Sequence, residues 1–254
     1  GWIVCGNDHL GHGRTALEEK DYGYMGGADG WKHMVVDMHT LTRRMQQLHP
    51  GMPYFLLAHS MGSFLGRPYL ARYGKELTGA IIMGTSSGVG WLPATAALGL
   101  IRVMSLIKGD RYRSSAVQKM VFGSYNRRLV DPATDSDWIS SDPETVKKYV
   151  ADPMCTFTFT LSGFRNLLQV LRSVSSPQWA RQVPQDLPIF IVSGEEDPVG
   201  SYGRGPAKVR ERLLRAGVQD VTLKLYPEYR HEPLNEVGRE QVYEDLYYWM
   251  ESKL

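Results

Sequence analysis

Short apolar runs alternate with amphipathic segments along most of this chain. Runs typical of buried strands occur at residues 2–5, 54–58, 80–83, 189–192 and 221–225. Apolar residues at helical spacing predict helices at residues 31–48, 61–73, 206–216 and 238–252. Such alternation of strands and helices is typical of a mostly parallel sheet with helices on both faces. The pattern therefore predicts an α/β fold.

The alternation stops between residues 88 and 180. This stretch contains helical pieces and several prolines but no clear strand, and it is too long for a simple loop. We therefore predict a helical cap at 88–180, inserted before the fourth strand. The core of the domain would then comprise residues 1–87 and 181–254.

Two serines lie in patterns that resemble the nucleophile elbow of serine hydrolases. The strict pattern Gly-x-Ser-x-Gly surrounds Ser86, and a relaxed version with alanine in the first position surrounds Ser60. Ser60 follows a predicted strand and opens a predicted helix, whose first N–H groups suit a developing oxyanion. Ser86 is followed by glycines and Pro93, which do not begin a helix. This context favours Ser60 as the nucleophile and a polar turn at Ser86.

A serine nucleophile needs a base, and an acid that orients the base. His231 follows the last predicted strand, at the sheet edge where the loop of Ser60 also emerges. Asp197 follows the fourth strand and is preferred over Glu195 and Glu196, because Pro198 fixes the turn behind it. The chain order Ser60, Asp197, His231 is that of the α/β-hydrolases.

Composition narrows the picture only slightly. The net charge of +2 gives no field that favours nucleic acid, so no nucleic-acid partner is expected. Cys5 and Cys155 lack metal-type spacing and favour a reducing, cytoplasmic location. His9 and His12 have no matching ligand pair elsewhere in the sequence, so no metal is expected. We find no run of about 18 apolar residues, and hence expect no membrane-spanning helix.

Four motifs together resemble the monoacylglycerol lipase and lysophospholipase branch of the α/β-hydrolases. They lie in this order at residues 8–14, 58–63, 194–198 and 230–236. The resemblance implies hydrolysis of monoacylglycerols, lysophospholipids or small acyl esters, with no cofactor. It also implies that the backbone N–H of Met61 is an oxyanion donor. We further expect substrate contacts at His59, Phe157, Phe159 and Val199.

The chain departs from this family at its beginning. Family members carry three more strands before the position of Gly1, and a loop after the third supplies the second oxyanion donor. We therefore expect a half-built oxyanion hole, exposed sheet edges and self-association at those edges. Three explanations stay open: a shortened chain, strands supplied by another chain, or direct pairing of residues 2–5 with 54–58.

The predicted cap also bears on the partners of the chain. Segment 102–128 carries seven basic residues and one aspartate, a formal charge of +6, beside an apolar run at 100–107. Transient contact with a lipid interface and a simple solvated cap face both fit this pattern. Two rival functions also remain: amide or peptide hydrolysis on the same fold, and a catalytically weak binding protein.

Overall fold

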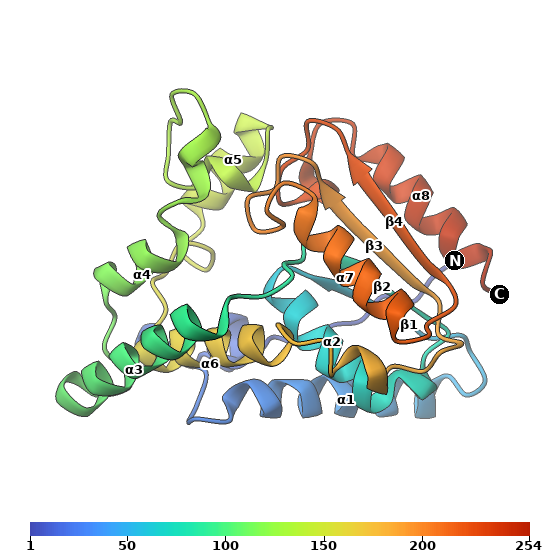
Figure 1. Ribbon diagram of the computed structural model, residues 1–254, viewed down its shortest axis with the longest axis horizontal. Coiled ribbons are helices and arrows are strands. Elements are labelled where there is room, and N and C mark those ends of the chain that lie inside the picture. Colours follow the sequence, from blue (N-terminus) through green and yellow to red (C-terminus); the bar gives the residue numbers. More distant parts are fainter.

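The computed structural model describes residues 1–254 and contains one four-stranded parallel sheet, in the order β1-β2-β3-β4 (Figure 1). The strands are β1 (Phe55–His59), β2 (Gly79–Met83), β3 (Ile189–Gly194) and β4 (Val221–Tyr226). The two central strands, β2 and β3, are buried along their whole length. The predicted α/β fold with a mostly parallel sheet is confirmed.

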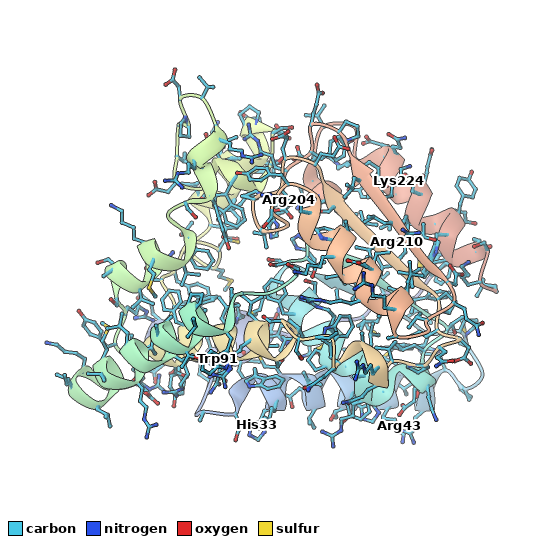
Figure 2. The ribbon with its side chains drawn as sticks, in the orientation of Figure 1. His33, Arg43, Trp91, Arg204, Arg210 and Lys224 are labelled. Atoms are coloured by element: carbon cyan, nitrogen blue, oxygen red, sulfur yellow. The ribbon has the colours of Figure 1, made fainter.

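Helices cover both faces of this sheet. They are α1 (Gly30–Leu48), α2 (Met61–Tyr73), α7 (Arg204–Arg215) and α8 (Glu240–Glu251). Successive strand residues face opposite sides, so Ile82 packs with α1, α2 and α7, whereas Ile81 packs with α8. On the outer side of α1, His33 and Arg43 point away from the core (Figure 2).

Between β2 and β3, four helices and two of the three short 3₁₀ turns extend away from the sheet (Figure 1). They are α3 (Trp91–Lys108), α4 (Ser115–Phe122), η4 (Tyr125–Arg128), η5 (Asp137–Ile139), α5 (Pro143–Ala151) and α6 (Leu161–Ser173). Helix α3 packs along α6, and Ile101, Phe164 and Leu168 form part of a separate small core. Helix α6 also reaches the main core through Leu167 and Val170.

Short 3₁₀ turns occupy several connections elsewhere in the chain. They are η1 (Gly13–Thr15), η2 (Glu19–Asp21), η3 (Gly74–Glu76), η6 (Ala180–Gln182) and η7 (Pro233–Asn235). The turns η1 and η2 lie in the glycine-rich segment before α1, and η7 lies in the segment that connects β4 to α8. Loops therefore provide the residues at the carboxyl ends of β3 and β4.

Helix α3 corrects one expectation from the sequence. It is long and apolar enough to cross a membrane, by length and composition alone, and only 11% of its residues are buried. The expectation that no such stretch occurs is therefore wrong for residues 91–108. The helix carries two cations, Arg102 and Lys108, within this apolar stretch.

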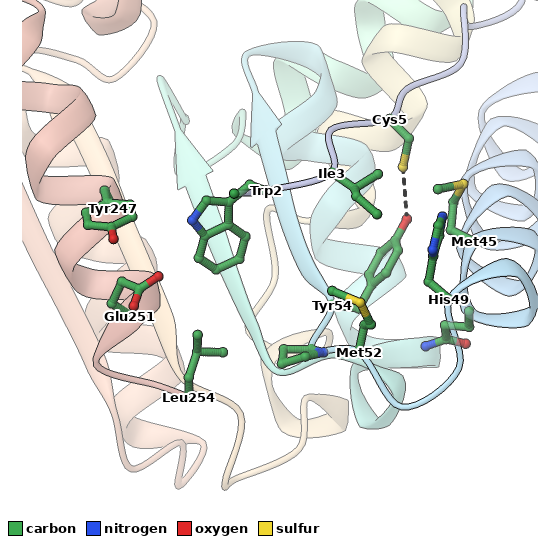
Figure 3. A pocket seen from close by; sticks show the side chains of 13 residues that line it. Trp2, Ile3, Cys5, Met45, His49, Met52, Tyr54, Tyr247, Glu251 and Leu254 are labelled. Atoms are coloured by element: carbon green, nitrogen blue, oxygen red, sulfur yellow. Dashed lines mark hydrogen bonds between the residues drawn. The ribbon is translucent and has the colours of Figure 1, made fainter.

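The predicted strand at residues 2–5 is wrong. Residues 1–8 make no backbone–backbone hydrogen bond, and Val4 is 91% exposed. The segment contacts the region of β1 only through side chains. The Trp2 ring packs edge-on against Phe55, and the Cys5 Sγ lies 3.6 Å from the Tyr54 hydroxyl (Figure 3). Direct pairing of 2–5 with 54–58 is therefore also wrong.

A groove of about 250 Å³ lies beside this segment, which contributes Trp2, Ile3 and Cys5 to its lining. Its lining includes Met45 of α1, Met52 and Tyr54 before β1, and Tyr247 of α8 (Figure 3). An apolar run in a sequence records a tendency to be buried, but it does not specify the strand that would supply the hydrogen bonds. Strand β1 therefore lies at one end of the four-stranded sheet, and Leu57 is 46% exposed.

We expect Gly66→Ala to destabilise the fold. A Cβ at Gly66 of α2 would lie 2.9 Å from the Cβ of Ala58 of β1. Overpacking costs about 1–3 kcal/mol, against roughly 1 kcal/mol gained in helix propensity. Urea unfolding of Gly66→Ala, Ala58→Gly and the double variant should show stabilising coupling of the two substitutions. Purely additive effects would contradict this account.

Candidate active site

Ser60 lies at the turn between β1 and α2. Its backbone is in an unfavourable region for a residue with a side chain, at φ 53° and ψ −122°. The Ser60 N–H donates to the Met83 carbonyl of β2, which ties the turn to the sheet. The N–H of Met61 belongs to the first turn of α2 and has no backbone acceptor. The strand, turn and helix give the geometry of a nucleophile elbow.

His231 connects Ser60 to Asp197. Its Nε2 lies 2.7 Å from the Ser60 hydroxyl, and its Nδ1 lies 3.0 Å from Asp197 Oδ1. With Nδ1–H donating to the carboxylate, Nε2 is free to accept the serine proton. His231 and Asp197 are buried, at 3% and 0% exposure. This arrangement can activate a serine hydroxyl.

Other hydrogen bonds hold the carboxylate of Asp197. The Val199 N–H donates to Oδ1 at 2.9 Å, and the Ser193 hydroxyl lies 3.4 Å from Oδ2. A buried carboxylate needs such donors, because desolvation of an unpaired charge is costly. The competing carboxylates Glu195 and Glu196 are exposed to solvent, as expected from the sequence.

Ser86 has different surroundings. It follows β2, and its hydroxyl accepts a hydrogen bond from the Gly88 N–H within its own turn. The neighbouring Thr85 is buried and accepts from Ser63 of α2. The literal motif therefore lies in a turn that leads into the cap, and the relaxed motif at Ser60 contacts the histidine.

His59 lies beside the base rather than in an open position. Its Nε2 donates to the His231 carbonyl at 2.9 Å, and the two rings lie 4.8 Å apart. Burial, with a smaller contribution from His231, lowers the pKa of His59 to about 4. The neutral ring fits because Gly84, at φ +56°, has no side chain; a Cβ there would lie 2.9 Å from His59 Nε2.

The remaining predicted substrate residues stay predictions. Phe157 and Phe159 belong to an aromatic cluster with His12 and Tyr22, in which the Tyr22 and Phe157 rings stack 5.3 Å apart. Val199 lies directly after the turn of Asp197 and is half-buried. Burial lowers the pKa of His12, whose Nδ1 lies 3.0 Å from the Leu10 carbonyl.

Two residues that shape the site have no role predicted from the sequence. Glu236 is fully buried, and its carboxylate accepts hydrogen bonds from the Arg230 N–H and from Ser141 of the cap. Trp138 of η5 lies against His231, with ring centroids 5.0 Å apart. The position of Glu236 in one of the family motifs could have indicated its role. Nothing in the sequence around Trp138 indicates its contact with His231.

An elbow serine with an acid and a histidine in this chain order, on a parallel sheet, defines an α/β-hydrolase. A family model described as serine aminopeptidase, S33, matches residues 1–238, and the chain belongs to this family. The resemblance to the monoacylglycerol lipase branch is confirmed as well, because two similar proteins bear that name.

One of these is a monoacylglycerol lipase of Mycolicibacterium smegmatis, 30% identical over 100% of this chain and 80% of the relative. The other is the human monoglyceride lipase, 26% identical over 99% of this chain and 74% of the relative. A thermostable carboxyl esterase from Bacillus coagulans, crystallised with glycerol, superposes with a TM-score of 0.87 at 34% identity. That match covers 96% of this chain and 79% of the esterase. Two lipases and one esterase are thus among the proteins similar to this chain.

We expect His59 to contribute to acid sensitivity. Its pKa is about 4 in the folded protein and 6.5 when unperturbed, so the unfolded state takes up the proton first as the pH falls. The contribution of His59 to the free energy of unfolding is therefore fully present above pH 6.5. It decreases by roughly 3 kcal/mol as the pH falls to 4. Urea unfolding at about pH 7 and pH 4.5 should show a smaller loss in His59→Gln.

His33→Gln is the matched control for this measurement, because His33 is exposed on α1. It should lose stability with falling pH as the wild type does. Equal losses in His59→Gln and the wild type would contradict the assignment.

Proposed function

We propose that this protein is a serine hydrolase that cleaves carboxylic esters through an acyl-enzyme on Ser60. The observation that carries the proposal is the pair of contacts of His231, 2.7 Å to the Ser60 hydroxyl and 3.0 Å to Asp197. Lipases and an esterase among its relatives support esters as substrates. Monoacylglycerols, lysophospholipids and small acyl esters are the proposed substrate class.

The mechanism follows from the roles of these three side chains. The Ser60 hydroxyl attacks the ester carbonyl carbon as its proton passes to Nε2 of His231, and Asp197 stabilises the imidazolium. The new C–O bond leaves a negative oxygen, for which the Met61 N–H is the proposed donor. The bond to the alcohol then breaks, and His231 returns the proton to the leaving oxygen. Water, deprotonated by His231, releases the acid and regenerates Ser60.

Amide or peptide hydrolysis is a second candidate, because the matching family is described as a serine aminopeptidase. The same three side chains can perform both reactions, since an amide differs mainly in its leaving group. Initial rates with a nitrophenyl ester and with an aminoacyl nitroanilide separate the two. We expect turnover of the ester and at most slow turnover of the amide; the reverse ranking would favour a peptidase.

We expect Ser60→Ala to abolish both ester hydrolysis and labelling by a fluorophosphonate probe. Removing a triad member typically lowers kcat by about 10⁴-fold or more. Ser86→Ala is the matched control, since it removes the hydroxyl of the other motif and should retain labelling. The measurements are the rate of ester hydrolysis and the mass of the labelled peptide. Absence of labelling in the wild type would instead support a catalytically weak binding protein.

We also propose that α3 contacts an anionic lipid surface. One side of the helix packs on α6, but an apolar row remains exposed on the other side, where the side chain of Trp91 projects at its start (Figure 2). The row comprises Leu92, Leu100, Val103, Leu106 and Ile107, of which Leu106 is 81% exposed.

The charge around α3 favours an anionic partner. Arg102 and Lys108 are exposed beside the apolar row, and Lys119 is exposed on the following helix. Basic residues next to an apolar helix face are typical of helices that lie in the interface of anionic membranes. A lipid surface is also where esters with long acyl chains are found, so the contact would bring the enzyme to its substrate.

We expect Leu106→Glu/Ile107→Glu to weaken binding to vesicles that contain phosphatidylglycerol. Full burial of each side chain stabilises by about 1.5–3 kcal/mol, so affinity should fall at least 10-fold. Co-sedimentation measures this effect, and hydrolysis of a soluble ester should not change. Leu48→Glu/Met52→Glu is the control, because it introduces the same charge at exposed apolar positions near the end of α1. Equal binding by both double variants would contradict the proposal.

A further inference from the structure

The ring of His231 lies against two other rings. One is the ring of His59 of β1, with centroids 4.8 Å apart and planes at 42°. Trp138 of η5 lies 5.0 Å away, with planes at 46°. Tyr125 of η4 continues the row, packing edge-on against Trp138 at 4.8 Å. The base of the proposed triad thus contacts an indole supplied by the inserted helices and turns.

Hydrogen bonds fix the segment that carries Trp138 to the loop that carries His231. The Arg230 guanidinium donates to the carbonyls of Asp137 and Ser140, at 2.6 and 2.9 Å. The Glu232 N–H donates to the Ile139 carbonyl at 2.9 Å. The backbone before and after Trp138 is therefore held relative to the loop of His231.

Glu236 also joins the segment of Trp138 to the loop of His231. Its carboxylate is fully buried and accepts from the Arg230 N–H at 2.7 Å and from the Ser141 hydroxyl at 2.6 Å. Within the inserted segment, the backbone N–H of Trp138 donates to the side-chain oxygen of Asn126 at 2.9 Å. Trp138 therefore has little freedom to leave His231 while these bonds persist.

The electrostatic consequence depends on the charge of His231. The imidazole is neutral before the reaction and becomes a cation when it takes the serine proton. The face of an indole attracts a cation within about 6 Å of the ring centroid, and tryptophan does so better than the other aromatic residues. A neutral imidazole gains less from the same ring. The contact therefore favours the protonated state that forms during the reaction.

Two other titratable groups contact the ring of His231, namely His59 from β1 and Asp197 from the loop after β3. The charged residues Arg230, Glu232 and Glu236 lie in the same loop as His231, and Tyr125 of η4 lies near Asp197. Burial, together with the charge of Asp197, raises the pKa of Tyr125 to about 12. None of these groups is altered by a substitution at Trp138.

We propose that Trp138 is a positioning residue for His231, whose indole holds the imidazole and stabilises its protonated form during ester hydrolysis. The inference rests on the proposed function and deepens it, because it assigns part of the base's environment to the inserted segment. If Trp138 has this role, the rate of ester hydrolysis depends on how η4 and η5 are placed next to His231.

The test compares Trp138→Leu and Trp138→Phe with the wild type, using a soluble nitrophenyl ester and the pH profile of kcat/KM. Leucine keeps an apolar side chain but has no aromatic face, whereas phenylalanine keeps a ring. We expect Trp138→Leu to lower the plateau of kcat/KM by roughly 3- to 20-fold, from the loss of a cation–π contact. The acidic limb of its profile should also move to lower pH, by about 0.3–1 unit.

The sign of this shift separates the proposal from a purely structural role. Without the indole, the protonated base is less stable, so the neutral and active form persists to lower pH although the reaction is slower. Trp138→Phe should give an intermediate plateau and a smaller shift. An acidic limb that does not move, or that moves to higher pH, would overturn the proposal.

Trp31→Leu is the matched control, because Trp31 of α1 is half-buried and belongs to the main core. It should leave the acidic limb in place, and an equal shift in this variant would also overturn the proposal. Thermal unfolding verifies that each variant is folded. If Trp138→Leu fails to fold, the shift of the acidic limb in Trp138→Phe tests the proposal instead. Failure of the proposed function has a different signature, namely wild-type hydrolysis that does not depend on Ser60.

Discussion

The hydrogen bond between His231 and the buried carboxylate of Asp197 is the interaction on which the rest of the site depends. Asp197 has no exposure to water, so its charge is stabilised only by the donors around it. The bond fixes Nδ1 of His231 as the donor and leaves Nε2 directed at Ser60. Three loops at the carboxyl edge of one parallel sheet must meet for this to occur.

Close packing around the elbow places Ser60 next to His231. Small residues allow β1, α2 and the loop after β2 to approach closely: Gly66 faces Ala58, and Gly84 leaves room for His59 and His231. The strained backbone at Ser60 is held by the strand before it and the helix after it. The alanine at the first small position of the motif is accommodated because the helix opposite it offers a glycine.

The inserted segment is more than a cover for the site. Its residues in and around η5 contact the loop of His231 through the buried Glu236, the Arg230 guanidinium and the ring of Trp138. Helix α3, at the far end of the same insertion, leaves an apolar row exposed. The insertion thus combines an exposed apolar outer surface with an inner surface that contacts His231.

The sequence by itself determined the α/β class and the positions of most core helices and strands, and it predicted Ser60, Asp197 and His231, which the structure brings together. These follow from local periodicity and from the rule that parallel strands end at a common edge. It wrongly predicted a strand at residues 2–5, because pairing requires a neighbouring strand that local pattern does not specify. Only the tertiary structure decided the contacts of His59, Trp138 and Glu236 with the base loop. Such contacts join residues up to 172 positions apart, and long-range packing leaves no periodic trace in the sequence.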